Sequence, residues 1–420
     1  MLENHRQTTL FYQFLGSHSL LIGLLPFYLP VYLWGVGLNL AHITLLIGIS
    51  GLSFCAALSA WQPLSRRLSL KRLMCITFIL ELLLVASTFF ASEAWYAVAS
   101  LGIANGLYNG FFWTTQRTLF LQLLGANDTG RRFGNFQIFV TVFLKIGILI
   151  GGWSLDAGGL PWLLMLSAVI GGLSSLWFLL KANSNSLHDH SSNGNATDDY
   201  ASNDSAINDY ESSATSEGGN PSIGLNQALA YKDKHHSRPV FIVDGFFLFL
   251  ESHYWTLSLF MLAEENYAKF GVIVVLLALI FALLFFLIKN TIDTYAVGLV
   301  FRIAVLLYAL SWVLRCFVSN ELRSSILLLL LLVITFCSSF FRLAFNKRFF
   351  DIAAANNGVG YLLMKSYQSQ FVLGCGFIFI SFVLWLTGST SLDALTPMYL
   401  AAAALSFVYL LYRLNTSANR

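Results

Sequence analysis

A chain of 420 residues that is 57% hydrophobic and only 11% charged has too few ionic groups to cover a water-soluble globule of its size. Its net charge of +3 is small and its basic residues are scattered through short segments, which excludes a nucleic-acid-binding surface. The five cysteines form no CxxC pair and have no histidine cluster beside them, which argues against structural disulfides and zinc sites. The composition therefore predicts that the main partner of the chain is the lipid bilayer.

Long apolar stretches divide the chain into two groups. A helix of roughly 20 mainly apolar residues covers the hydrocarbon core of a bilayer, and six such stretches precede residue 182 while six follow residue 238. The predicted spans are 11–35, 43–61, 73–90, 95–116, 133–153, 162–180, 240–262, 272–288, 295–317, 326–345, 361–386 and 398–414. The fold class predicted from them is an all-α polytopic membrane protein with twelve transmembrane helices in two six-helix bundles.

A polar segment separates the two groups of spans. Residues 182–238 are rich in Ser, Asn, Asp and Gly and cannot bury enough apolar surface to offset their chain entropy. We predict a disordered linker there, between an N-terminal bundle (residues 1–181) and a C-terminal bundle (residues 239–420). The linker histidines, His188 and His190 among them, are irregularly spaced, which favours simple solvation over a metal site. No cofactor is expected.

Basic residues gather on one side of the predicted membrane, with the linker and both termini. The loops on the other side carry only Lys269 and Arg323, beside several acidic residues. Because Lys and Arg are retained on the cytoplasmic side, both termini and the linker are predicted to be cytoplasmic. We expect a multi-pass protein of a bacterial inner membrane.

The loop between the second and third spans, residues 63–72, reads PLSRRLSLKR. This basic loop, the six-plus-six arrangement and the central polar segment resemble the major facilitator superfamily, whose signature at this place combines glycine, aspartate and arginine. Arg66 stands where the family usually has aspartate, and Ser69 where it usually has glycine. The resemblance implies two pseudo-symmetric bundles that rock around a central site. The gating residues that it implies are Arg67, Lys71, Arg72 and Arg117.

Lys145 is the deepest cation of the N-terminal half. At 1.5 Å per residue it lies roughly 18 Å along the fifth span, near mid-membrane, where a charge costs about 2.5–3.5 kcal/mol on insertion scales. One interpretation makes Lys145 a ligand for an anionic group in a central cavity. The alternative is a structural ion pair or a contact with helix carbonyls.

Asp244 and Glu251 lie seven residues apart on the seventh span, so they share one helix face. Glu251 is near mid-depth, where a carboxyl group that alternates between two water-accessible states exchanges a proton with either side. A proton-coupling role for Glu251 is therefore one hypothesis. The alternative for Asp244 is a cap or ion pair at the cytoplasmic mouth.

Polar side chains recur on the fourth span at helical spacing. Asn105, Tyr108, Asn109 and Gln116 form one stripe, which is predicted either to face the cavity or to supply hydrogen bonds between helices. On the eleventh span, Lys365 and Gln368 form a polar patch that mirrors Lys145 in the other half.

Several further ionisable residues in the spans have no assigned role at the site. His18 is interpreted as a packing histidine, and Glu81 has no assigned role. Arg315 and Arg342 are placed near span ends and are predicted to extend toward the membrane surface.

These features favour a secondary active transporter of a small solute, working by alternating access as a monomer, with H+ as a candidate coupling ion. The chain has no GxxxxGK[ST] loop for ATP and no HExxH or GxSxG motif, so it is not expected to be an enzyme. The alternatives are a transport-inactive receptor or scaffold and, less favoured by the motifs, a membrane-embedded enzyme.

Overall fold

The computed structural model describes residues 2–123, 129–181, 223–292, 297–319, 321–354, 358–388 and 391–412. These residues form helices and turns and contain no β-strand. The N-terminal half contains α1 (Leu2–Leu24), α2 (Leu29–Gly35), α3 (Leu40–Arg67), α4 (Leu70–Phe89), α5 (Trp95–Leu123) and α6 (Thr129–Lys181). The all-α fold class is confirmed.

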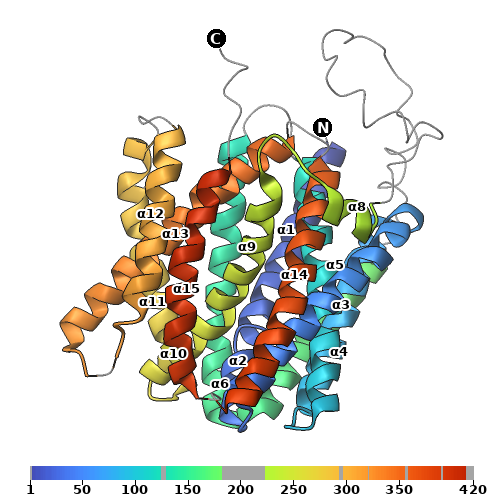
Figure 1. The fold of residues 1–420 in the computed structure, drawn as a ribbon. Coiled ribbons are helices and arrows are strands. Elements are labelled where there is room, and N and C mark those ends of the chain that lie inside the picture. Colours follow the sequence, from blue (N-terminus) through green and yellow to red (C-terminus); the bar gives the residue numbers. More distant parts are fainter. Residues whose placement is uncertain are drawn as a thin grey trace.

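The C-terminal half has the same helical character with more interruptions (Figure 1). It contains α8 (Leu225–Ala230), α9 (Ser237–Phe249), the π-helical stretch η1 (Leu250–Trp255), α10 (Thr256–Leu262), α11 (Tyr267–Ile292), α12 (Val297–Arg315), α13 (Ser324–Ala354), α14 (Gly358–Thr387), η2 (Leu392–Ala394), α15 (Leu395–Leu405) and η3 (Ser406–Leu411). The start of α1, the end of η3 and α8 lie at one end of the bundle, which we call the linker end (Figure 1).

Eight helical stretches of the described residues are long and apolar enough to cross a membrane. One of them, Ile138–Leu180, contains two predicted spans, because Gly159 (φ 67°) and Pro161 break α6 at the end opposite the linker. The predicted spans missing from the eight are α5, which carries the polar stripe, the segment α9–η1–α10, and α11.

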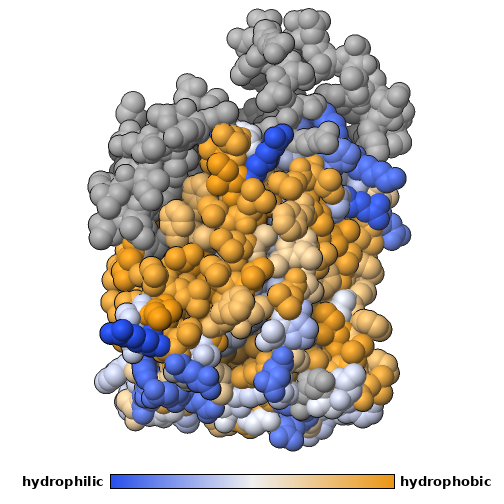
Figure 2. All heavy atoms as spheres, turned by 60° about the vertical axis from the view of Figure 1, so that its left-hand side comes forward, coloured by the Kyte–Doolittle hydropathy of each residue, from blue (hydrophilic) through white to orange (hydrophobic). Residues whose placement is uncertain are grey.

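A wide apolar band surrounds the molecule between two polar ends. Figure 2 shows this band on one face, with hydrophilic residues above and below it. Large apolar side chains stay exposed on many helices, as at Trp153 (69%), Leu279 (60%) and Phe379 (65%). A water-soluble protein rarely exposes so much contiguous apolar surface, whereas lipid tails cover it without cost.

Two helix pairs form the largest contacts between the halves. The first pair is α3 and α14. Near one end of this pair Ser381 Oγ donates a hydrogen bond to the Ala41 carbonyl (2.7 Å), and near the other end Ser59 Oγ and Tyr367 Oη are hydrogen-bonded at 3.0 Å. Close approach depends on glycine: a Cβ on Gly48 would lie 2.8 Å from the backbone nitrogen of Ile378. Small residues at such contacts let helix backbones pack tightly in lipid.

The second pair, α6 and α11, meets at the end opposite the linker. Asp156 of α6 accepts hydrogen bonds from the backbone N–H groups of Tyr267 (3.2 Å) and Ala268 (2.8 Å), at the first turn of α11. A carboxylate at a helix N-terminus is favoured by the helix dipole. Asp156 therefore links the two halves at this end of the molecule.

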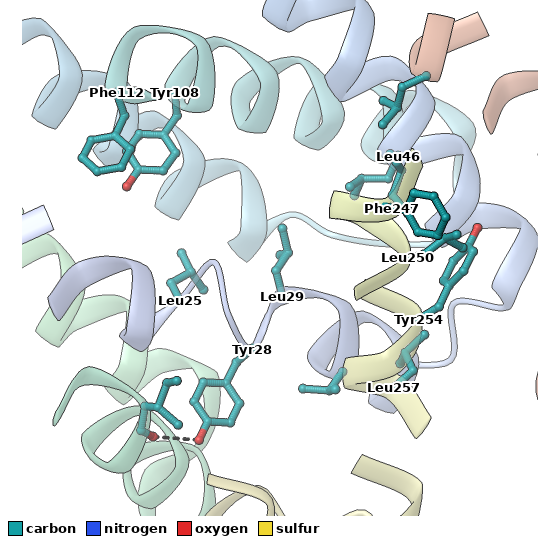
Figure 3. Close-up of a cluster of buried hydrophobic side chains, with 14 of the residues drawn as sticks. Leu25, Tyr28, Leu29, Leu46, Tyr108, Phe112, Phe247, Leu250, Tyr254 and Leu257 are labelled. Atoms are coloured by element: carbon teal, nitrogen blue, oxygen red, sulfur yellow. Dashed lines mark hydrogen bonds between the residues drawn. The ribbon is translucent and has the colours of Figure 1, made fainter. Parts of the chain in front are cut away.

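Apolar residues of both halves meet near η1. Figure 3 shows Leu250, Tyr254 and Leu257 beside Leu46, and the bond from Tyr28 Oη to the Ile148 carbonyl, 2.7 Å long. All these side chains are buried in the core.

The last part of the predicted linker is folded, because Ile223 and Ala228 are apolar and bury themselves between α3 and α14. Gln62 of α3 bonds both the N–H (2.8 Å) and the carbonyl (2.9 Å) of Ile223, and Gln368 of α14 donates to the Ala228 carbonyl (2.6 Å). Helix α8 thus spans the seam between the halves at the linker end. Residues 182–222 lie outside the described residues.

Candidate functional site

The seventh predicted span is helical but irregular. Between α9 and α10 the chain forms one π-helical stretch, and Glu251 lies in it. Stretches of this kind are uncommon and occur often at functional sites. Asp244, in α9, is almost completely buried at 1% side-chain exposure. The two carboxylates are therefore held on one irregular helix inside the apolar band.

One arginine joins both carboxylates. Arg342 of α13 places Nη1 2.6 Å from Asp244 Oδ1 and Nε 3.0 Å from Glu251 Oε2, and Nη2 donates to Tyr308 Oη at 3.3 Å. The carboxylates share a helix face, as their spacing predicted. A single planar guanidinium can serve them both because it carries five N–H donors in a fixed fork.

Asp244 has two further partners. Lys365 Nζ of α14 lies 3.0 Å from Asp244 Oδ2, and Tyr409 Oη of η3 donates to Asp244 Oδ1 at 2.8 Å. The Lys365 ammonium also lies 4.5 Å from the centre of the Phe349 ring. These contacts compensate the buried charge of Asp244, which would otherwise be costly.

Glu251 has a second cation on its other side. Arg315 of α12 places Nη2 3.6 Å from Glu251 Oε1 and donates to Ser338 Oγ at 2.9 Å. Its guanidinium lies 3.8 Å from the centre of the Trp312 ring, a stacked cation–π arrangement. Glu251 is thus held between two guanidinium groups.

We call these five ionisable residues, Asp244, Glu251, Arg315, Arg342 and Lys365, the cation-rich cluster. Three cations face two carboxylates, so the cluster carries a net charge of +1 when all five are ionised. Glu251 and Arg342 keep 21% and 18% of their side-chain surfaces exposed. Such a cluster can accept an anionic group at its accessible side.

The N-terminal half contributes two more cations. Arg117 of α5 interacts electrostatically with Asp244 and Lys365 across the seam, and lies 5.5 Å from the centre of the Trp113 ring. Lys145 of α6 is half-buried and has no ion pair or hydrogen bond with the residues that the structure describes. The structural ion pair that was the alternative for Lys145 is not seen in that part of the chain.

The polar stripe of α5 is split between two surroundings. Asn105 donates to Ser50 Oγ of α3 (3.1 Å), Asn109 donates to Asn105 Oδ1 (2.9 Å), and Trp113 Nε1 donates to Asn109 Oδ1 (3.1 Å). Tyr108 points elsewhere: its ring stacks on Phe112, as Figure 3 shows, and its hydroxyl has no hydrogen-bond partner in the described residues. Asn105 links α5 to α3, whereas the bonds of Asn109 stay within α5 and its side chain is half-exposed.

The other candidates lie at the linker end. Gln368 bonds α8, and its side chain is fully buried. Arg67, the last residue of α3, and Arg72, in the first turn of α4, are exposed, whereas Lys71 is 2% exposed. They flank the turn where the resemblance places a gating loop, but among the described residues Arg67 and Arg72 form no hydrogen bond or ion pair with the C-terminal half.

Sequence reasoning was wrong about two arginines. Arg342 and Arg315 do not extend toward the membrane surface: α13 continues to Ala354, well past the predicted span end at residue 345, so Arg342 lies inside the bundle. The Arg315 side chain is 1% exposed. The sequence beyond residue 345 continues to favour a helix. The predicted end of the span was therefore a poor guide to the depth of Arg342 in the bundle.

A second ionisable group was also missed, in the N-terminal half. His18 of α1 and Glu81 of α4 place Nδ1 and Oε2 3.5 Å apart, with side chains 0% and 1% exposed. In the part of the chain that the structure describes, neither residue forms a hydrogen bond or ion pair with the cation-rich cluster. The sequence signal was the cost of two ionisable residues in apolar spans.

Comparison with known proteins supports the family and the fold. A family model described as Major Facilitator Superfamily matches residues 15–413. The crystal structure of the nucleoside transporter NupG is similar with a TM-score of 0.64 and 16% identity, covering 99% of this chain and 100% of that one. The in meso crystal structure of the POT family transporter PepTSo gives a TM-score of 0.60 at 12% identity, covering 96% and 97%. No curated protein sequence matches the chain.

Proposed function

Because the chain belongs to the major facilitator superfamily, we propose that it is a secondary transporter of a small anionic solute, with the cation-rich cluster as its central binding site. The fold and family make it a transport protein of the membrane, and the solute and its coupling are the proposed part. The carrying observation is the net charge of +1 among five ionisable residues that have partly exposed members.

The charge balance favours an anionic group. Arg342 and Lys365 already neutralise Asp244, and Arg315 remains beside Glu251 with two guanidinium nitrogens, Nε and Nη1, that have no hydrogen-bond partner in the described residues. An incoming carboxylate or phosphate would complete such unsatisfied donors through charge-assisted hydrogen bonds. A cationic solute would instead add to an existing excess of positive charge.

Transport by alternating access requires the two halves to move relative to each other around this site. The cluster lies in the C-terminal half, while Arg117 and Lys145 belong to the other half, so a rocking motion moves the two sets of cations relative to each other. The solved structures named above are those of a nucleoside transporter and a POT family transporter. At 12–16% identity they support the fold and leave the solute to the residues of this chain.

The test is uptake by purified protein in proteoliposomes, with a panel of anionic, neutral and cationic solutes. Arg315→Met removes the guanidinium that carries the unsatisfied donors while Glu251 keeps Arg342, so anion affinity should fall about tenfold to a hundredfold, since a hydrogen bond to a charged group contributes about 1.5–3 kcal/mol. Lys269→Met is the matched control, because Lys269 is 47% exposed and pairs with Glu264 in a loop.

Lys145→Met gives a second test. Lys145 has no partner in the described part of the chain, so the substitution should weaken anion uptake while membrane abundance stays unchanged. Preferred uptake of cations, or wild-type anion uptake by both variants, would contradict the anionic assignment. If the protein binds a solute but never moves one across the vesicle membrane, it is a receptor.

We also propose that the linker end faces the cytoplasm of a bacterium, because it carries most of the basic loop residues. A reporter that is active only in the cytoplasm should be active when fused after Lys181 and inactive when fused at Gly388. The reverse pattern would overturn the orientation.

A further inference from the structure

The His18–Glu81 pair lies deep in the N-terminal half. The two side chains come from α1 and α4, their facing atoms are 3.5 Å apart, and together they expose almost no surface. A separation of 3.5 Å is longer than a good hydrogen bond. The pair is therefore close enough to interact electrostatically, but the distance is too long for a good hydrogen bond.

Aromatic rings enclose the pair. His18 stacks on Phe78, with ring centres 4.0 Å apart, and meets Phe14 (4.6 Å) and Phe112 (4.7 Å). Phe178, from the second part of α6, packs against both Phe14 and Phe78. The pair therefore has an apolar surround, and the described residues contain no group of three metal-ligating side chains.

Few polar groups face the pair. Tyr108 of α5 lies 6.1 Å from the His18 ring and interacts electrostatically with Glu81, while α6 contributes the ring of Phe178. Within the described residues, both His18 nitrogens, both Glu81 carboxyl oxygens and the Tyr108 hydroxyl have no hydrogen-bond partner, and no Lys, Arg or Asp forms an ion pair with them.

This environment favours uncharged side chains. A buried carboxylate without hydrogen-bond donors is costly, and the simplest way to remove its charge is to bind a proton. The cation-rich cluster is different, because Glu251 lies between Arg342 and Arg315. Among the described residues Glu81 has no such cation beside it, so a proton is the simplest partner for its charge.

We propose that Glu81, with His18 beside it, is the proton-binding site that couples transport to a pH gradient. This inference rests on the proposed transport function. When the half opens to water, the Glu81 carboxylate takes up one H+ and becomes a carboxylic acid, and no other bond changes. In the closed state the acid is sealed among the aromatic rings, and it releases the same proton when water reaches it from the other side.

The first test needs no solute. Infrared spectra of the purified protein in detergent, equilibrated across about pH 5 to 8, should contain a protonated-carboxyl band that titrates and that Glu81→Gln removes. Glu93→Gln is the matched control, because Glu93 is exposed in the turn after α4. His18→Gln should shift the titration, and Glu81→Asp should retain a titrating band, a result that a purely structural carboxyl would not give.

Two outcomes would overturn the proposal. If Glu81→Gln leaves the protonated-carboxyl spectrum unchanged, Glu81 is ionised and is not a proton carrier. If the Glu81 band is present but never titrates, the residue is a permanently neutral packing group. Melting temperature and gel-filtration profile of each variant establish that the protein is folded when the spectra are taken.

The second test uses the solute found in the uptake panel. With one proton per solute, a one-unit pH gradient drives about tenfold accumulation. Glu81→Gln should abolish that accumulation and preserve solute exchange without a gradient. Loss of exchange in wild-type protein would refute the transport function itself, whereas wild-type accumulation by Glu81→Gln would refute only the proton site.

Discussion

The two halves of the molecule bury ionisable side chains in different ways. In the C-terminal half, Asp244 has three partners, Arg342, Lys365 and Tyr409, and every contact is between 2.6 and 3.0 Å. In the N-terminal half, the one ion-pair partner that His18 and Glu81 have among the described residues is each other, at 3.5 Å. Paired opposite charges stabilise the ionised form of each group. An apolar environment with few hydrogen-bond donors instead favours the neutral form of a carboxyl group, which can therefore bind and release a proton.

The difference also predicts opposite responses to mutation. Removing one member of a buried charged network leaves the remaining charge without compensation, whereas replacing a complete buried pair by apolar side chains is often neutral or stabilising. Stability measurements alone can therefore test this difference between the halves, without knowledge of the solute.

The largest effect is expected for Arg342→Ala. This substitution separates both carboxylates from their shared cation and should cost about 3–5 kcal/mol, because a buried pair that loses one partner leaves an uncompensated charge. Melting temperature in detergent measures the loss, with Arg323→Ala as the control, since Arg323 is exposed in the loop before α13. Equal melting temperatures for the two variants would mean that the cluster is solvated.

A smaller effect of opposite sign is expected for the double variant His18→Leu/Glu81→Met. Both replacements are apolar and similar in size to the native side chains, so melting should be unchanged or correspond to about 1–4 kcal/mol of added stability. The same variant should lose pH-driven accumulation. A strongly destabilised double variant would show that the pair is a structural ion pair, and the contrast between the halves would disappear.

The smallest effects come from a matched tyrosine pair. Tyr409→Phe removes the hydroxyl that donates to Asp244 and should cost about 1.5–3 kcal/mol, the usual range for a hydrogen bond to a charged group. Tyr108→Phe removes an equally buried hydroxyl that has no partner in the described residues, so stability should stay the same or rise. A similar loss in both variants would indicate an unrecognised partner for Tyr108.

The sequence by itself determined the fold class and most of the span positions. The apolar stretches are long enough to span a membrane and form two groups with a polar segment between them, and these are local properties of the sequence. The fold class follows because few backbone structures other than helices are possible in a bilayer. The shared face of Asp244 and Glu251 followed from helical spacing alone. The sequence also identified Lys365 as an intramembrane cation, although not its partner.

Only the tertiary structure decided which charges meet. Arg342 reaches Asp244 from a helix nearly a hundred positions further along, and its depth depends on where α13 ends, which hydropathy alone placed too early. In the same way, a packing histidine and an unassigned glutamate became a pair because α1 and α4 bring them together. Helical periodicity fixes the face of each residue on its own helix, but contacts between helices depend on packing, which a single span does not encode.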